Sequence, residues 1–264
     1  MKKSPIQKEW DNLIKKEQQY IKKHKKEKYS IINDKLEKVI PSGLQSKLDS
    51  AFMKGFELVF EKGKTIIEKT YDKKTYETDY EVNEYATTIK KDRKSIRKFT
   101  AKAKTTSAKN LLISGVEGIV LGAVGVGIPD IPVFIGVLLK SIYEIALSYG
   151  FEYESEEERN FILQLIYTAM YYGNDFEELD AKMNKLIFKL NQGEAVSIKI
   201  DEQIKCAAKT LSSELLYMKF LQGIPIAGII GGISDVTCLQ TITEYAIIKY
   251  QKRFLIKKKY EDKQ

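Results

Sequence analysis

Apolar residues recur at intervals of three and four along most of the chain, and prolines and glycines rarely interrupt them. The clearest example follows Pro41, where one helical face collects Leu44, Leu48, Phe52, Phe56, Val59, Phe60 and Ile67. This spacing places side chains on one side of an α-helix, whereas no segment shows the alternation of a half-buried strand. We therefore predict an all-α fold, a multi-helix globular domain of about eight or nine helices.

The N-terminal segment predicts a charged helix. Ser4 and Pro5 suit an N-cap and a first-turn proline, and the helical pattern continues to about Lys28. Lysines surround one apolar face, which holds Ile6, Trp10, Leu13, Ile14, Tyr20 and Ile21. Two interpretations stay open, because such a face can pack on the body of a protein or lie in a membrane interface. We divide the chain into a basic helical arm, residues 1–40, and a main all-α domain, residues 41–264.

Capping residues and glycines predict the boundaries of the remaining conventional elements. Residues 71–81 are polar and rich in tyrosine, which favours a loop. A helix over about residues 82–109 would carry Tyr85, Ile89, Ile96, Phe99 and Ala103 on its apolar side. Ser155 and either Asn174 or Asp175 are typical N-caps, and Gly173 and Gly193 are typical C-terminal residues. They bound two helices, and a further helix covers about residues 201–221.

Two long apolar runs, residues 111–149 and 215–246, each contain a glycine-rich segment that ends in an aspartate. The two segments overlay when one is shifted by 105 positions. Their corners contain Gly127, Pro129, Asp130 and Pro132 in the first and Gly232 and Asp235 in the second. We predict two apolar helical hairpins related as a pseudo-repeat, each with an aspartate that caps the outgoing helix. Gly150 would end the helix that leaves the first corner.

The same corners do not suit phosphate binding. A Walker A loop needs Lys-Ser/Thr directly after its last glycine, and neither corner has it. Asp130 and Asp235 could form an acid–base pair if the corners met, but capping explains both residues. Within the first run, Lys140 and Glu144 have the spacing of a helical ion pair.

Other catalytic or metal-binding patterns are missing from the sequence. His24 is the single histidine and sits among lysines, so we predict that it lies on a solvated face. Cys206 and Cys238 lack the spacing of metal ligands. We therefore expect no catalytic residue, no metal and no cofactor, and a protein that is not an enzyme.

The length of the first apolar run raises the question of a bilayer. Residues 119–139 carry one charge and are long enough to span a membrane. Pro129, Asp130 and Pro132 would break a spanning helix in its middle, where unpaired backbone groups are costly. We favour core helices of a soluble or peripheral protein, and keep re-entrant hairpins and two true spans as alternatives.

Positive charge is concentrated in three segments of a chain whose net charge is +8. These are residues 1–28, 88–109 and 249–264, and such segments are candidates for contact with an anionic membrane surface. The candidate contact residues are Trp10, Leu13, Ile14, Lys15, Lys22, Arg93, Lys94, Arg97, Lys98, Lys257, Lys258 and Lys259. Nucleic-acid binding through residues 88–109 is a weaker alternative.

A family resemblance rests on the first corner and on the segment directly after it. Gly127, Pro129, Asp130 and Pro132 precede a helix end with Ile145, Ala146, Tyr149 and Gly150, and then Glu158 and Arg159. This order resembles the EcsC protein family over roughly residues 40 to 255, without the N-terminal arm. The family is named from a gene that lies beside those of an ABC transporter's ATPase and permease. The resemblance implies a setting in membrane transport or the cell envelope, and supplies no catalytic residues.

Together these observations predict a non-enzymatic protein that binds peripherally to a membrane. We expect it in the cytoplasm, at the inner face of the cell membrane, because the N-terminus has no secretory signal. It would be accessory to a membrane transport or envelope process, with an ABC transporter or another envelope protein as a partner. The alternative is a soluble carrier for a lipid or another hydrophobic small molecule, held in a cavity between the glycine-bearing helices.

Overall fold

A computed structural model describes residues 3–25, 43–116, 130–173, 175–221 and 233–261, and these residues form helices and no strand. The prediction of an all-α fold is therefore confirmed. The elements, in chain order, are α1 (Pro5–His24), α3 (Leu44–Leu58), the π-helical turn η1 (Val59–Gly63), α4 (Lys64–Glu68), α5 (Lys73–Lys90), α6 (Arg93–Val116), α7 (Asp130–Ser148), α8 (Glu156–Ala169), α9 (Asp175–Gln192), α10 (Ile200–Leu221) and α11 (Ile233–Glu261).

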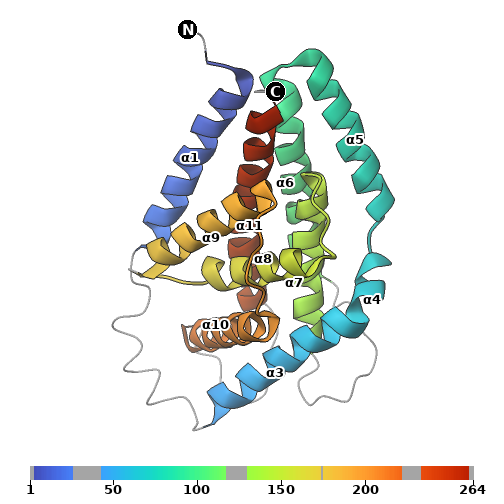
Figure 1. Ribbon diagram of the computed structural model, residues 1–264. Coiled ribbons are helices and arrows are strands. Elements are labelled where there is room, and N and C mark those ends of the chain that lie inside the picture. Colours follow the sequence, from blue (N-terminus) through green and yellow to red (C-terminus); the bar gives the residue numbers. More distant parts are fainter. Residues whose placement is uncertain (1–2, 26–42, 117–129, 174, 222–232, 262–264) are drawn as a thin grey trace.

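The long helix α11 is the centre of the arrangement, and it contacts α1, α6, α7, α8, α9 and α10. Figure 1 shows α1 and α5 on opposite flanks of the bundle, with α3 and α10 crossing its lower end. The beginning of α1, the turn between α5 and α6 and the end of α11 all lie at the upper end (Figure 1). Described parts of the three segments that are basic in sequence thus lie at one end of the molecule.

Local sequence signals set most helix boundaries. The Ser4 and Ser155 hydroxyls accept hydrogen bonds from the backbone N–H groups of Gln7 and Glu158, both at 3.1 Å. After α7 and α9, Gly150 and Gly193 adopt positive φ angles of 74° and 67°. Such left-handed residues favour glycine because they satisfy the last helical carbonyls without a Cβ clash. The predictions at these positions are confirmed.

One predicted boundary is wrong, because residues 71–81 do not form a loop. Residues 73–90 form α5, and the chain then turns at Lys91, which has a φ of 44°. Asp92 accepts a hydrogen bond from the backbone N–H of Ser95 at 2.7 Å and so caps a new helix, α6. The Asp92–Ser95 spacing is the sequence signal that marks this break.

The break changes which side chains are buried. Ile96, Phe99 and Ala103 of α6 are in the core, as predicted, but Tyr85 and Ile89 of α5 are exposed. A single helix would have carried both groups on one face. The turn gives α5 its own orientation, so its apolar residues do not follow those of α6.

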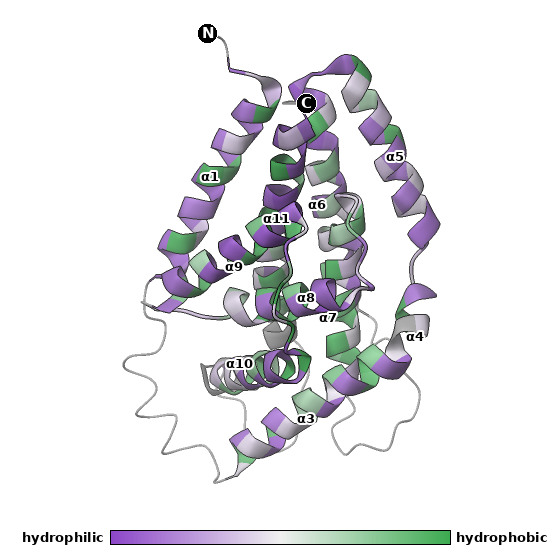
Figure 2. Cartoon of the chain, in the orientation of Figure 1, coloured by the Kyte–Doolittle hydropathy of each residue, from purple (hydrophilic) through white to green (hydrophobic). Residues whose placement is uncertain are grey.

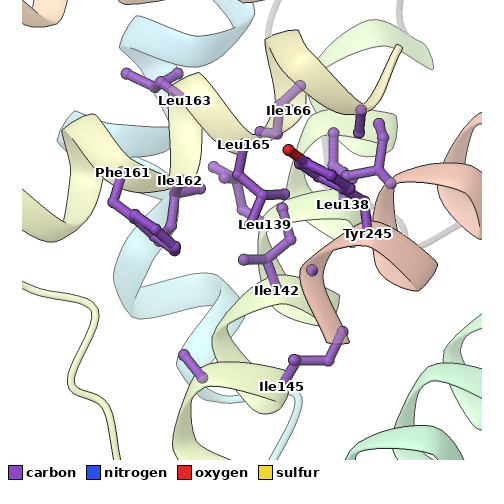
Figure 3. Close-up of a cluster of buried hydrophobic side chains, with 14 of the residues drawn as sticks. Leu138, Leu139, Ile142, Ile145, Phe161, Ile162, Leu163, Leu165, Ile166 and Tyr245 are labelled. Atoms are coloured by element: carbon purple, nitrogen blue, oxygen red, sulfur yellow. The ribbon is translucent and has the colours of Figure 1, made fainter. Parts of the chain in front are cut away.

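The apolar centre of the protein lies between α7, α8 and α11. Figure 3 shows Leu138, Leu139, Ile142 and Ile145 of α7 against Phe161, Ile162, Leu165 and Ile166 of α8 and Tyr245 of α11. Among the described helices, α7 alone has the length and apolar composition to cross a membrane, over Ile131–Ser148 at a mean hydropathy of 1.7. In this structure 89% of that window is buried by neighbouring helices. In Figure 2, α7 is correspondingly more hydrophobic than α1 or α5.

The apolar face of α1 packs on the body, against α6, α9 and α11. Ile6, Leu13 and Tyr20 of this helix are buried. His24 continues the same face and is fully buried, with its ring stacked 3.9 Å from the ring of Tyr20. The prediction that His24 is solvated is therefore wrong: it lies one helical turn after Tyr20 and faces the same way.

The predicted corners of the two hairpins lie largely outside the described residues. Gly127, Pro129 and Gly232 are among those outside. Asp130 is the first residue of α7, and Asp235 is the third residue of α11, but neither side chain is described. The pseudo-repeat and the capping role of the two aspartates stay predictions.

Candidate functional site

Four exposed lysines are spread over the solvent-facing side of α6. This helix contains seven lysines and arginines and no acidic residue. Four of its lysines, Lys94, Lys98, Lys104 and Lys109, are exposed and form no ion pair with other described residues. We call these four residues the α6 basic strip.

Contacts on both sides place the strip between α1 and α5. On one side, the buried carboxylate of Glu9 in α1 accepts hydrogen bonds from Arg93 and from Arg97, the latter at 2.9 Å. On the other side, the Lys102 ammonium donates to Asp79 of α5 at 2.5 Å. The remaining arc of α6 faces solvent. The arginines and Lys102 thus anchor the helix, while no described acid compensates the strip.

Cationic groups of α1 add to this surface. Burial lowers the pKa of Lys16, and the positive charges of Lys104, Arg97 and Arg93 lower it further against the opposing effect of Glu9. A lysine whose proton is disfavoured by three neighbouring cations marks a region of positive potential. Lys15 and Lys22 of α1 are also exposed, and at about 100° per residue they lie roughly 100–120° around that helix from Lys16.

Of the three apolar residues of α1 predicted to touch a membrane, one is buried and two are partly buried. Leu13 is completely buried, and Ile14 is partly buried. Trp10 is also partly buried, with the Lys259 ammonium 3.8 Å from the centre of its ring. Leu13 therefore leaves the candidate contact set, because the body of the protein already covers the face to which it belongs.

The basic end of α11 is largely used inside the protein. Lys258 is buried and binds Glu84 of α5 and Glu261, the latter at 2.7 Å. Because it is buried, Lys258 is removed from the candidate contact set. Lys257 is exposed, as predicted for a contact residue. The pattern follows from the packing of α11, which turns successive basic residues toward α1, α5 and α8.

Two lysines earlier in α11 belong to a buried ionic cluster with α1 and α9. The ammonium of Lys249 lies 2.5 Å from Glu17 and 2.6 Å from Asp180, and that of Lys252 lies 2.7 Å from Glu17. Asn184 accepts hydrogen bonds from both ammonium groups, at 3.0 and 2.9 Å. Two cations and two anions therefore neutralise each other, and they join α1 to the centre of the bundle.

Arg253 makes a similar contact with α8. One of its guanidinium nitrogens donates to both carboxylate oxygens of Glu158, at 2.6 and 2.8 Å. The guanidinium also lies 4.2 Å from the ring centre of Phe151 and 4.4 Å from that of Phe161. This base is thus held inside the protein, although its buried Nε has no hydrogen-bond partner among the described residues.

An exposed apolar stripe lies on α5, which has no buried residue. Val82, Tyr85 and Ile89 are 62%, 70% and 64% exposed. We call these three residues the α5 stripe. Sequence reasoning missed it because it assigned Tyr85 and Ile89 to a packed face. The spacing of three and four was visible, but its direction depends on the turn at Lys91.

A pocket beside α7 has a volume of about 10 Å³, which suits one water molecule. It is lined by Ile66, Ile67, Thr70, Val133, Gly136, Val137 and Lys140. This pocket does not accommodate a lipid chain.

The prediction that Lys140 and Glu144 form an ion pair is wrong. Both side chains are buried, yet no ion pair within 4 Å joins these two described residues. The Glu144 carboxylate instead accepts hydrogen bonds from Tyr76, at 3.1 Å, and from Asn110. Burial raises the pKa of Glu144 despite these partners and the nearby Lys140 charge.

No metal centre is present among the described side chains, where no three His, Cys, Asp or Glu residues are grouped to hold an ion. The acid–base alternative of Asp130 and Asp235 cannot be placed, since both side chains lie outside the described part of the chain. The geometry that stands out is therefore a surface, formed by the α6 basic strip, the α1 lysines and the α5 stripe.

Comparison with known proteins gives a family and no closer relative. No curated protein and no solved structure matches the chain. The model of the EcsC protein family matches residues 7–255, which includes most of α1 and extends the resemblance beyond the expected start near residue 40. The N-terminal helix is thus part of the shared pattern, in agreement with its packing on the bundle. Because the match covers nearly the whole chain, the protein belongs to the EcsC protein family.

Proposed function

We propose that this protein binds peripherally to anionic membrane surfaces through the α6 basic strip and the exposed lysines of α1. The observation that supports the proposal is the row of exposed lysines, none paired with a described acid, on a helix without acidic residues. A basic residue close to an anionic membrane contributes about 1 kcal/mol, so the four strip lysines supply about 4 kcal/mol. The acidic residues of the body that could oppose this attraction are in part neutralised by buried bases of α11.

Within this proposal, the protein acts at the inner face of the cell membrane as a non-enzymatic accessory to a transport or envelope process. An ABC transporter or another envelope protein would be its partner. Family membership supports this setting, because the family is named from a gene that lies beside those of such a transporter. In this setting the protein recognises the membrane surface, and the partner carries out any chemical reaction.

Co-sedimentation with lipid vesicles tests the proposal. The full chain is mixed with vesicles of phosphatidylcholine alone or with an added anionic phospholipid, at increasing salt. We expect binding that requires the anionic lipid and weakens as salt screens the charges. The triple variant Lys94→Glu, Lys98→Glu and Lys104→Glu should bind at least tenfold more weakly.

A matched control uses lysines at the other end of the molecule. Lys54 of α3 and Lys205 and Lys209 of α10 are exposed, and Figure 1 shows both helices far from the basic end. Their triple change to glutamate alters the net charge equally and should leave most of the binding intact. Binding that ignores anionic lipid and salt, or an equal loss in both triple variants, would refute the proposal. The same variants with duplex DNA test the nucleic-acid alternative, which predicts a steep dependence on salt.

A further inference from the structure

The α5 stripe is an apolar surface on a helix that packs on the body with its other side. Val82, Tyr85 and Ile89 are each more than three-fifths exposed. At about 100° per residue they fall within an arc of roughly 60°, so they form one line along the helix. Thr75 and Thr78 continue this line toward the start of α5 and carry no charge. The line itself therefore carries no charge, while the exposed Glu81 lies about 40° around the helix from Tyr85.

The acidic residues of α5 are mostly held away from this line by bases. Asp79 binds Lys102 of α6, Glu84 binds Lys258 of α11, and Glu77 lies 3.7 Å from Lys73 of the same helix. These contacts direct the carboxylates toward the body or along the helix. The fourth acid of α5, Glu81, is exposed, so an anionic surface that approached the α5 stripe would meet that one carboxylate beside it.

Basic residues continue directly from the end of the stripe. Ile89 is followed by Lys90 and Lys91, which are exposed, and the chain then enters the α6 basic strip at Lys94. An apolar line that ends in a cationic surface matches the two layers of an anionic membrane, its acyl region and its headgroups. An apolar protein partner would explain the stripe but not the adjoining charge.

We infer that the α5 stripe inserts into the boundary between headgroups and acyl chains while the α6 basic strip binds the anionic headgroups. The inference rests on the proposed function and identifies the part of the protein that enters the bilayer. Val82 and Ile89 lie about 10 Å apart along the helix axis, so α5 would lie nearly flat in the interface. Tyr85, between them, places its ring among the acyl chains and its hydroxyl at the headgroups.

The first test replaces the stripe in the full chain with Val82→Ser, Tyr85→Ser and Ile89→Ser. Because all three side chains are exposed, the variant should keep its helical circular dichroism and its melting temperature. We expect its partition onto anionic vesicles to fall at least tenfold, which corresponds to about 1.4 kcal/mol. The control is Ile66→Ser with Phe188→Ser, which changes exposed apolar residues on α4 and α9 and should leave the partition unchanged.

The second test measures insertion itself. The chain has one tryptophan, Trp10, so Trp10→Phe with Tyr85→Trp moves the fluorophore to the stripe. Vesicles with brominated acyl chains should quench this tryptophan, whereas Trp10 of the wild type, which is partly buried beneath Lys259, should be quenched much less.

The outcomes separate the inference from the proposed function. If the wild type does not bind anionic vesicles, the proposed function fails, and the inference fails with it. If the wild type binds but the serine variant binds equally and the tryptophan at position 85 is not quenched, the inference alone is overturned. If the wild type is a dimer in sedimentation velocity without lipid and the serine variant is a monomer, the stripe is an interface between copies, which also overturns the inference.

Discussion

The buried ionic cluster of Glu17, Asp180, Lys249 and Lys252 makes a strong prediction about stability. Glu17→Gln keeps the shape of the side chain and removes one of the two negative charges of the cluster, whose charges balance in the wild type. Lys249 is fully buried and Glu17 nearly so, which leaves little water to compensate the remaining positive charge. Removing one partner of a buried pair costs about 3–5 kcal/mol. For a domain of this size that corresponds to a decrease of roughly 6–20 °C in melting temperature.

Urea unfolding followed by circular dichroism measures this change, with Glu177→Gln as the matched control. Glu177 forms an ion pair with Lys25 at 2.7 Å, but both side chains are more than half exposed. The same chemical substitution should therefore cost less than about 1 kcal/mol there. If both variants lose equally little stability, the desolvation of the cluster offsets its attraction, and the reasoning is refuted.

The dependence on pH gives an independent check. Burial raises the pKa of Glu17, but the charges of Lys249 and Lys252 outweigh it and hold the pKa below the usual 4.5. The unfolded chain therefore takes up the proton more readily than the folded one. The stabilisation by ionised Glu17 is complete above about pH 4.5 and is lost as pH falls through the lower folded pKa. The difference between wild type and Glu17→Gln should shrink over that acidic range, and a difference that stays constant there would contradict the assignment.

Two further variants test the packing of α7. Burial raises the pKa of Glu144 above 4.5, so its ionisation destabilises the fold as pH rises through the folded pKa. In the same urea assay at pH 7, Glu144→Gln should therefore be as stable as the wild type, or more stable by about 1 kcal/mol. A large loss in this variant would show that Glu144 is needed in its charged form. Gly150→Ala should cost about 2–5 kcal/mol, because its φ is positive and the new Cβ would lie 2.3 Å from the Tyr80 ring. Gly193→Ala has a similar φ but no neighbour within 4 Å, and should cost only about 1–2 kcal/mol; equal losses would exclude the Tyr80 contact as a cause.

The positions of the charged residues show why only part of the candidate surface could be predicted from the sequence. The sequence located three basic segments, and the structure brings described parts of them to one end of the molecule. Counting charges along the chain, however, cannot tell which bases are neutralised by distant acids. Lys249 and Glu17 are 232 positions apart, yet their atoms lie 2.5 Å from each other. The strip on α6 was predictable because that helix contains no acid, whereas the burial of Lys258 was not.

The α5 stripe shows a second limit of prediction from the sequence, which concerns the direction in which a helical face points. Apolar spacing identified residues that share a helical face, but one residue in a left-handed conformation, Lys91, decides where that face points. His24 illustrates the same limit from the opposite side. Its lysine-rich neighbourhood suggested solvent, while its position four residues after Tyr20 placed it in the core.

By itself, the sequence determined the all-α class, most helix boundaries, the apolar character of α7 and the resemblance to the EcsC family. These properties depend on residues close together in the chain, namely helical periodicity, caps and terminal glycines. Only the tertiary structure decided that α1 is packed, that most bases of α11 are internal, and that α5 exposes an apolar line. Each of these depends on contacts between helices that are distant in sequence, and local patterns carry no information about such contacts.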